Sequence, residues 1–220
     1  MKYYKAMNKD FTCKKFQYEI GKTYELPKDT EMKIHYSGFH FCDILNACFN
    51  YYYKNNSIIC EVEPLGKVDR DISESILVTD KIKIVRQLSD EEIEEQRYII
   101  QDGIEMIGTG CFDHSDLREI KIPESVTIIQ TGSFAGCELL NKVTIPKSVS
   151  VLRWGCFEEC INLEEVIFTN NVDYVYYDVF HSCDNLKKIY VPKEFNKDVF
   201  NECIINNFTP LLSRVKVVEY

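Results

Sequence analysis

Glycine and proline are scarce in this chain, at 9 and 6 of 220 residues. Their scarcity excludes a collagen-like repeat and argues against a long low-complexity linker. The sequence also lacks any apolar run of about 18 residues, the length that a membrane helix needs, and no apolar run of signal-peptide length follows the lysines near the N-terminus. With 45% hydrophobic and 28% charged residues, the composition is that of a folded chain. We therefore expect a cytoplasmic protein with no membrane partner.

Basic residues are also in deficit. Lysine and arginine number 26 against 35 aspartates and glutamates, which gives a net charge of −9. A nucleic-acid partner would need a basic surface, so we expect none. Residues 1–88 hold 14 basic and 12 acidic side chains, whereas residues 89–220 hold 12 and 23. This asymmetry favours two structural units.

The common motifs for nucleotide binding and catalysis are missing. The chain contains no P-loop, no G-x-G-x-x-G fingerprint, no H-E-x-x-H zinc motif and no G-x-S-x-G nucleophile elbow. Ten cysteines would suggest disulfides in an exported protein, but without an export signal we expect free thiols. The sequence therefore predicts no cofactor and no catalytic residue that a motif would identify.

From about residue 102, the sequence repeats with a period of 22 or 23 residues. The repeated columns are Phe112, Phe134, Phe157 and Phe180; Cys137, Cys160 and Cys183; Leu140, Leu163 and Leu186; Val143, Val166 and Ile189; Ile145, Phe168 and Val191. Residues 117–122 read Leu-x-x-Ile-x-Ile, and the other units copy this pattern with apolar residues at the same positions, which predicts a short strand with one inward face. One unit cannot bury this face alone, so the units are expected to stack into a parallel β-solenoid.

Residues 133–149, SFAGCELLNKVTIPKSV, resemble a repeat of the BspA-type leucine-rich repeat family. Nearly four such units cover residues 102–195, and the resemblance implies a solenoid that binds proteins. The first unit is one residue short between Phe112 and Leu117, and Ser115 stands at its cysteine position. Residues 196–220 are expected to form a C-terminal cap, because Phe200 and Cys203 come three residues early and Asn206 breaks the apolar pattern there.

The N-terminal part, residues 1–88, shows no copy of the repeat and is predicted to be an α+β domain. Residues 57–63 and 81–85 alternate like strands, and residues 43–53 have helical spacing. Ser89 and Glu92 form a capping box that predicts a connecting helix over residues 89–101. The motifs at residues 16–24, 37–42, 61–66 and 79–85 resemble an uncharacterised α+β domain of bacterial and phage proteins. That resemblance implies a bacterial or phage source and assigns no activity.

Histidine and cysteine do not make a convincing metal site in this sequence. The repeat cysteines form no Cys-x-x-Cys pair, and the column needs a small buried side chain, which a free thiol provides. His114 and His181 are interpreted as loop residues beside this column. In the N-terminal part, the spacing of His40 and Cys42 fits no zinc-finger pattern. We therefore predict no metal site.

The leading functional hypothesis is a non-catalytic module that binds a protein partner through the surface of its repeats. On the strand face, Glu119, Lys142, Glu165 and Lys188 form one outward column, and Lys121, Thr144, Ile167 and Tyr190 form the next. Alternating charges in the first column are expected to pair across the sheet. On the other wall, the candidate binding residues are Arg153, Trp154, Tyr176 and Tyr177, because such side chains dominate binding hot spots.

Two alternatives belong to other functional classes. One is an enzyme in residues 1–88, where His40, Tyr24 and Glu61 or Glu63 would form a set of residue types similar to that used for ADP-ribosyl transfer. In that case the repeats would select the target. The other is a self-assembling structural protein, because a short solenoid with exposed edge strands can pair with a second copy and form a homo-oligomer.

Overall fold

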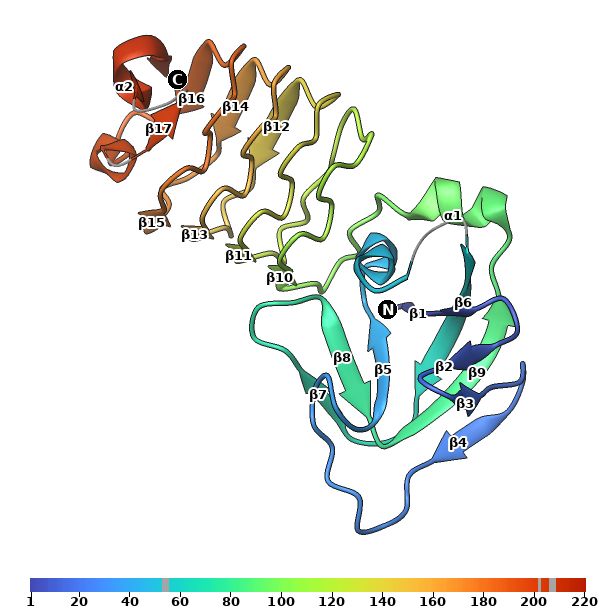
Figure 1. Cartoon of the computed structure of the whole chain (residues 1–220). Coiled ribbons are helices and arrows are strands. Elements are labelled where there is room, and N and C mark those ends of the chain that lie inside the picture. The colour runs from blue at the N-terminus through green and yellow to red at the C-terminus, as the bar shows by residue number, and fades with distance from the viewer. Residues whose placement is uncertain (53–55, 202, 206–208) are drawn as a thin grey trace. The chain divides into compact units, whose positions relative to one another are not determined.

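The computed structural model describes residues 1–52, 56–201, 203–205 and 209–220 (Figure 1). The chain divides into two compact units, Met1–Ile99 and Ile100–Tyr220. Within the described ranges, no helix has the length and apolar character needed to cross a membrane.

The N-terminal unit is built on one antiparallel sheet. The order of its seven strands is β4 (Thr23–Glu25), β9 (Lys81–Gln87), β6 (Ser57–Pro64), β1 (Tyr3–Asn8), β5 (Phe39–Cys42), β8 (Ile76–Thr79) and β7 (Val68–Arg70). A small hairpin, β2 (Thr12–Cys13) and β3 (Phe16–Gln17), lies outside this sheet. The apolar core includes Met7, Phe39, Phe41, Ile82 and Ile84. The strands predicted at residues 57–63 and 81–85 are confirmed as β6 and β9.

Helices are short in this unit. The segment predicted as a helix at residues 43–53 forms a 3-10 helix, η1 (Leu45–Asn50), and Tyr53 lies outside the described residues. The predicted capping box begins α1 (Asp90–Gln96), where Ser89 Oγ accepts from the Glu92 N–H and the Glu92 carboxylate accepts from the Ser89 N–H. The prediction that this helix reaches Gln101 is wrong, because α1 ends at Gln96. The β-branched pair at positions 99 and 100 favours extended backbone there.

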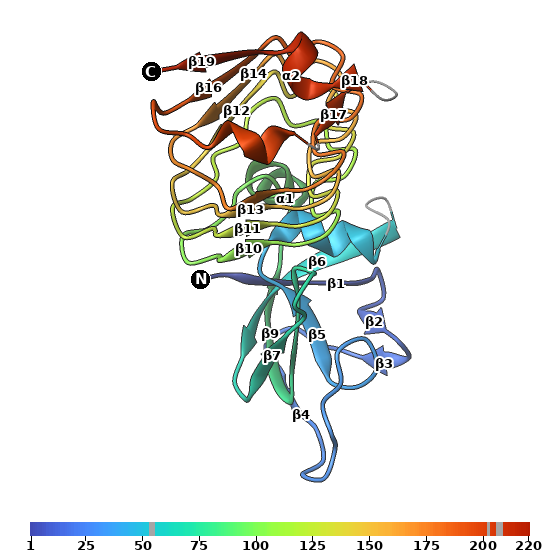
Figure 2. The same cartoon turned by 90° about the vertical axis from the view of Figure 1, so that its left-hand side faces the viewer.

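The second unit is a solenoid with two parallel sheets, and Figure 2 shows its turns stacked one upon another. One sheet contains β10 (Met106–Ile107), β11 (Ile128–Ile129), β13 (Val151–Leu152) and β15 (Tyr174–Val175). The other contains β12 (Lys142–Ile145), β14 (Glu165–Phe168), β16 (Lys188–Val191) and β19 (Lys216–Glu219). The predicted parallel solenoid is thereby confirmed.

One predicted strand of the solenoid is not formed. Residues 117–122 of the first unit have no strand conformation, although Leu117 and Ile122 remain buried. This unit is one residue shorter than the others, and its residues 117–122 form no ladder with β12. Consequently, β12 is the first strand of its sheet.

The repeated columns fill the interior of the solenoid. Phe112, Phe134, Phe157 and Phe180 stack with ring centroids 5.1, 5.1 and 6.0 Å apart along the column. The thiols of Cys137, Cys160 and Cys183 donate to phenylalanine carbonyls of the preceding turn at 3.1, 3.2 and 3.0 Å. These contacts assign the cysteine column a structural role, as predicted.

The sheet continues beyond residue 195, where the regular repeat pattern ends. After η3 (Lys197–Phe200), β17 (Ile204–Ile205), β18 (Thr209–Pro210) and α2 (Leu211–Arg214), the chain returns as β19 and pairs in parallel with β16. Phe200 is buried and stacks on Phe195 at 5.4 Å. The predicted break in the pattern at Asn206 lies outside the described residues.

Candidate functional site

The strand face of the solenoid carries an internally paired set of charges. Lys142, Glu165 and Lys188 are neighbours in the parallel register of β12, β14 and β16. Glu165 lies 3.2 Å from the Lys142 ammonium and 3.7 Å from that of Lys188, so the expected pairing is confirmed for these three residues. The pairing expected between Glu119 and Lys142 is not formed, because residues 117–122 form no strand beside β12. The Tyr190 hydroxyl donates to the same carboxylate at 3.1 Å. The hydrogen bonds from Lys142 and Tyr190 lower the pKa of Glu165.

The second outward column of this face is more apolar near the C-terminus. Thr144, Ile167, Tyr190 and Val218 follow one another across the sheet. Ile167 and Tyr190 are both half-buried, and the Tyr190 hydroxyl is bonded to Glu165. The charged groups of Lys142, Glu165 and Lys188 are thus bound to one another, and the two largest side chains of the second column are half-buried.

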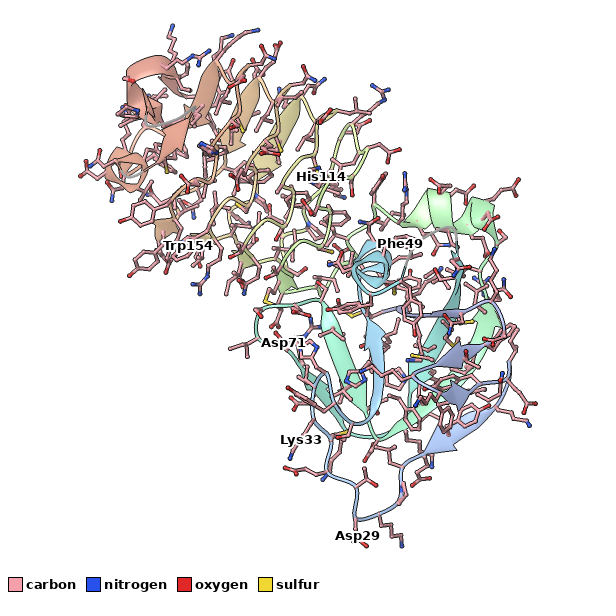
Figure 3. The ribbon with its side chains drawn as sticks, viewed as in Figure 1. Asp29, Lys33, Phe49, Asp71, His114 and Trp154 are labelled. Carbon is pink, nitrogen blue, oxygen red and sulfur yellow. The ribbon has the colours of Figure 1, made fainter. Side chains whose placement is uncertain are left out.

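The opposite wall carries exposed aromatic rings. The aromatic patch comprises Arg153, Trp154, Tyr174, Tyr176 and Tyr177. Trp154, Tyr174 and Tyr177 are 56%, 62% and 49% exposed. The Trp154 and Tyr176 rings lie 6.4 Å apart, and those of Tyr174 and Tyr176 lie 6.3 Å apart. Figure 3 marks Trp154 on the outer side of the sheet that contains β13 and β15.

The repeat backbone explains how these rings come together. Leu152 and Val175 point inward at the ends of β13 and β15, so the residues that follow them turn outward. The Gly155 N–H then donates to the Tyr177 carbonyl at 3.2 Å, which places position 154 of one turn beside position 177 of the next. Gly155 has a φ of +56°, a conformation that glycine adopts without steric cost.

Arg153 contributes a cation to this patch. Its guanidinium lies 5.1 Å from the centroid of the Tyr176 ring, within range of a cation–π interaction. Within the described part of the chain, its buried Nε has no hydrogen-bond partner. The sequence identified four members of the patch as candidates and did not single out Tyr174, the most exposed ring, although its position follows from the same repeat register.

The histidines of the repeats lie in loops. His181 Nδ1 is 3.1 Å from Glu158 Oε1, and His114 is exposed with its backbone in the left-handed region. Across the residues that the structure describes, no group of three or more histidine, cysteine, aspartate or glutamate side chains is arranged to hold a metal ion.

The residues proposed for an enzyme do not converge. Cys60 and Val62 face the core of the N-terminal unit, so Glu61 and Glu63 point to the other side of β6. Glu61 is bound by the Arg86 guanidinium at 3.1 Å. The grouping of these carboxylates with Tyr24 is therefore wrong, because alternation along β6 turns them away from the face of the sheet on which Tyr24 packs.

Comparisons with known proteins agree with these two units. The family model of the BspA type leucine-rich repeat region matches residues 93–217 in six copies. The model of a domain of unknown function (DUF7666) matches residues 1–96. The crystal structure of a leucine-rich repeat protein from Bacteroides ovatus is 26% identical and covers 55% of this chain, with a TM-score of 0.36. The match spans 30% of that protein's length. No curated protein matches the chain.

Proposed function

Since the chain belongs to the BspA-type leucine-rich repeat family, we propose a role in protein binding. In this proposal it is a non-catalytic module that binds a protein partner through the aromatic patch. Leucine-rich repeats are generally protein-interaction modules, because stacked units create an extended surface on a fixed core. The proposal places the contact on one wall of that surface, around Trp154.

The exposure of Trp154 is the observation that carries the proposal. The chain's single tryptophan is 56% exposed and lies beside tyrosines that are also exposed. Tryptophan, tyrosine and arginine dominate binding hot spots, because they bury a large area with few rotatable bonds. The Arg153 guanidinium, which lies 5.1 Å from the centroid of the Tyr176 ring, adds a cation to the same patch.

The strand face is the less favourable binding surface of the two. Its charged column is paired within the chain, with Glu165 shared between Lys142 and Lys188. A partner bound there would have to compete with these contacts, whereas the rings of the aromatic patch present apolar area directly. The predicted contacts at Ile167, Tyr190, Lys142 and Lys188 are therefore the second candidate surface.

Affinity purification with matched variants tests the proposal. The bait would be the full chain, its Trp154→Ala/Tyr177→Ala variant and its Leu139→Ala variant, in which an exposed apolar side chain outside the patch is shortened. We expect a protein that wild type and Leu139→Ala retain and the patch variant loses. Against that purified partner, Trp154→Ala alone should cost about 2 kcal/mol, or about 30-fold in Kd. Identical partners for all three baits would contradict the proposal.

Two further measurements separate the alternatives. The charge-reversed variant Lys142→Glu/Lys188→Glu should keep the partner if the aromatic patch binds it, and should lose the partner if the strand face does. Self-association is favoured by one observation: β15, which carries Tyr174, is the last strand of its sheet. Sedimentation over a concentration series would detect a homo-oligomer, and Trp154→Ala would dissociate it if the patch were the contact.

A further inference from the structure

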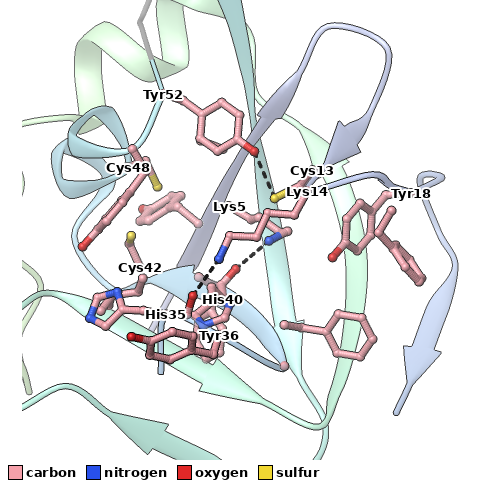
Figure 4. Close-up of a pocket in the computed structure, with 18 of the residues that line it drawn as sticks. Lys5, Cys13, Lys14, Tyr18, His35, Tyr36, His40, Cys42, Cys48 and Tyr52 are labelled. Carbon is pink, nitrogen blue, oxygen red and sulfur yellow. Dashed lines mark hydrogen bonds between the residues drawn. The ribbon is translucent and has the colours of Figure 1, made fainter. Parts of the chain in front are cut away.

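The N-terminal unit contains a cavity of about 620 Å³ that no part of the proposed function uses. This volume lies in the range of small-molecule sites, about 300–1,000 Å³. The cavity lies among β1, β5, the β2–β3 hairpin and η1, and Figure 4 shows the side chains that line it. The exposed side chains of Phe16 and Tyr36 are among them, so the cavity is accessible from solvent.

The residues that line the cavity are rich in aromatic and basic side chains. Eight of the 19 lining residues are phenylalanine or tyrosine, and four are lysine or histidine. Within the described part of the chain, no aspartate or glutamate lines the cavity, although acidic side chains outnumber basic ones in the whole sequence. His35 lies 3.5 Å from the Asp71 carboxylate, so Lys5 and Lys14 are the cations of this lining that favour a flat apolar group with negative charge.

The cavity opens where two strands separate. β1 and β5 share a single registered pair, Tyr4 and Cys42. Beyond that pair the carbonyl of His40 is bound by a side chain, since the Lys5 ammonium donates to it at 2.7 Å. Lys5 therefore occupies the gap between the strands and lines the cavity.

Lys5 is a buried cation that lacks an anion. Its residue is only 4% exposed, and its ammonium lies 5.3 Å from the Tyr18 ring centroid. No carboxylate of the described chain forms an ion pair with Lys5 or with Lys14, whose ammonium donates to the His35 carbonyl at 3.0 Å. A buried ammonium without a carboxylate partner attracts an anion, so an acidic group bound here would be stabilised.

His40 supplies a hydrogen-bond acceptor in the same cavity. Its Nε2 is buried and has no partner among the described residues. Its ring also has a hydrogen bond with the backbone of Lys33, which we assign to the Nδ1–H as donor because Nε2 has no partner among the described residues. The lone pair of Nε2 is thereby left free to accept from a ligand N–H or O–H.

We propose that this cavity binds a small aromatic anion, with its acidic group at the Lys5 ammonium, its ring among the tyrosines and phenylalanines, and an N–H or O–H donated to His40 Nε2. Lys14, at the exposed edge of the cavity, attracts the same acidic group. A carboxylate or a phosphate would satisfy this chemistry equally.

Two pairs of probes distinguish the acidic groups. Isothermal titration of the full chain with 4-hydroxybenzoate and with AMP should give a Kd below about 1 mM for at least one of them. Their neutral counterparts, methyl 4-hydroxybenzoate and adenosine, should bind at least about tenfold more weakly. 4-Methoxybenzoate, which cannot donate to His40, should also bind more weakly than 4-hydroxybenzoate. Equal affinity for charged and neutral probes, or no binding by either anion, would overturn the proposal.

Variants locate the binding in the cavity. Lys5→Met should abolish the preference for the charged probe. Should that variant not fold, Lys14→Gln serves instead, because Lys14 is exposed and its substitution leaves the core intact. Its matched control is Lys15→Gln, the next residue of the same turn, which does not line the cavity. We expect at least a threefold loss of affinity for Lys14→Gln and no change for Lys15→Gln, and equal effects would refute the site.

Discussion

At the scale of single residues, His40 shows how burial sets a charge. Burial is the largest cause that lowers its pKa, and the neighbouring Lys14, Lys5 and His35 add to it, so the value falls to about 4. The ring is therefore neutral at pH 7. An unfolded chain would protonate the same ring near its ordinary value of about 6.5.

This difference predicts a pH dependence of stability. Between pH 6.5 and 4, His40 is protonated in the unfolded state but neutral in the folded state. The free energy of unfolding must therefore fall as the pH falls through this window. Above pH 6.5 His40 contributes no slope. Because the ring is partly exposed, we expect a loss of about 1–2 kcal/mol. Hydrogen exchange of peptides from residues 1–99 measures it.

His40→Gln is the control for this prediction, because glutamine is polar and does not titrate. Its stability should change less between pH 6.5 and 4 than that of the wild type. Carboxylates also titrate near the lower end of the window, so the comparison rests on the difference between the two proteins. An identical pH profile for both would contradict the assignment to His40.

A second residue-scale prediction concerns left-handed backbone in the repeats. Gly136 has a φ of +64°, and the equivalent position of the next turn is Glu159, with a φ of +56°. A side chain in this conformation costs about 1–2 kcal/mol, and glycine's larger loss of entropy offsets part of the gain. Glu159→Gly should therefore raise the free energy of unfolding by about 0.5 kcal/mol, measured by urea titration of Trp154 fluorescence.

Glu159→Ala separates backbone strain from charge. Burial raises the pKa of Asp113, and the charge of the Glu159 carboxylate adds to this effect. Glu159→Ala removes that charge while it keeps a side chain on strained backbone. We expect Glu159→Gly to be more stable than Glu159→Ala. The reverse substitution, Gly136→Ala, should destabilise, because its Cβ would lie 2.2 Å from His114 Nδ1. If Glu159→Ala were as stable as Glu159→Gly, backbone strain would not be the cause.

At the scale of elements, the charged column of the strand face ends with two lysines side by side. Lys142, Glu165 and Lys188 alternate in sign, but the next residue in register is Lys216 of β19. Lys188 and Lys216 are thus like charges directly opposite each other, which destabilises a sheet. Lys216→Glu should restore the alternation and stabilise the second unit by about 0.2–1 kcal/mol at low salt.

The control for the Lys216→Glu variant is Lys193→Glu. It makes the same change of net charge at an exposed position outside the column. We expect thermal melting at low and high salt to show a gain for Lys216→Glu alone, and the gain should shrink as salt screens the pair. A gain of the same size in both variants would point to the overall charge of the chain.

The two units differ in how far their elements could be predicted from sequence. In the solenoid, each column repeats at fixed spacing, so one register argument places Trp154 beside Tyr177. In the N-terminal unit, strand pairs are distant in the chain, and β1 lies between β6 and β5 for reasons no local pattern shows. The cavity went unpredicted for the same reason. Its one signal was Lys5, a charge inside the otherwise apolar end of β1.

At the scale of the whole molecule, both units contain buried cysteines whose reactivity depends on folding. Cys42, Cys48 and Cys60 are buried in the first unit, and Cys111, Cys137, Cys156, Cys160, Cys183 and Cys203 are buried in the second. Burial raises the pKa of Cys60 to about 12 and holds that of Cys156 well above its usual range. Since the thiolate is the reactive form, these thiols are protected in the folded chain by both burial and protonation. Cys13 is only half-buried.

Alkylation of the cysteines should therefore report the unfolding of each unit separately. In native buffer, we expect iodoacetamide to modify Cys13 first and the buried thiols far more slowly. Each unit has its own core, so in a urea series its buried cysteines should lose protection together, at a midpoint that belongs to that unit. Peptide mapping by mass spectrometry assigns each thiol to its midpoint, and the Glu159→Gly variant should move only the midpoint of the second set. A common shift of all midpoints would mean that the two units unfold as one, because stabilising the repeats would then have protected Cys60 as well.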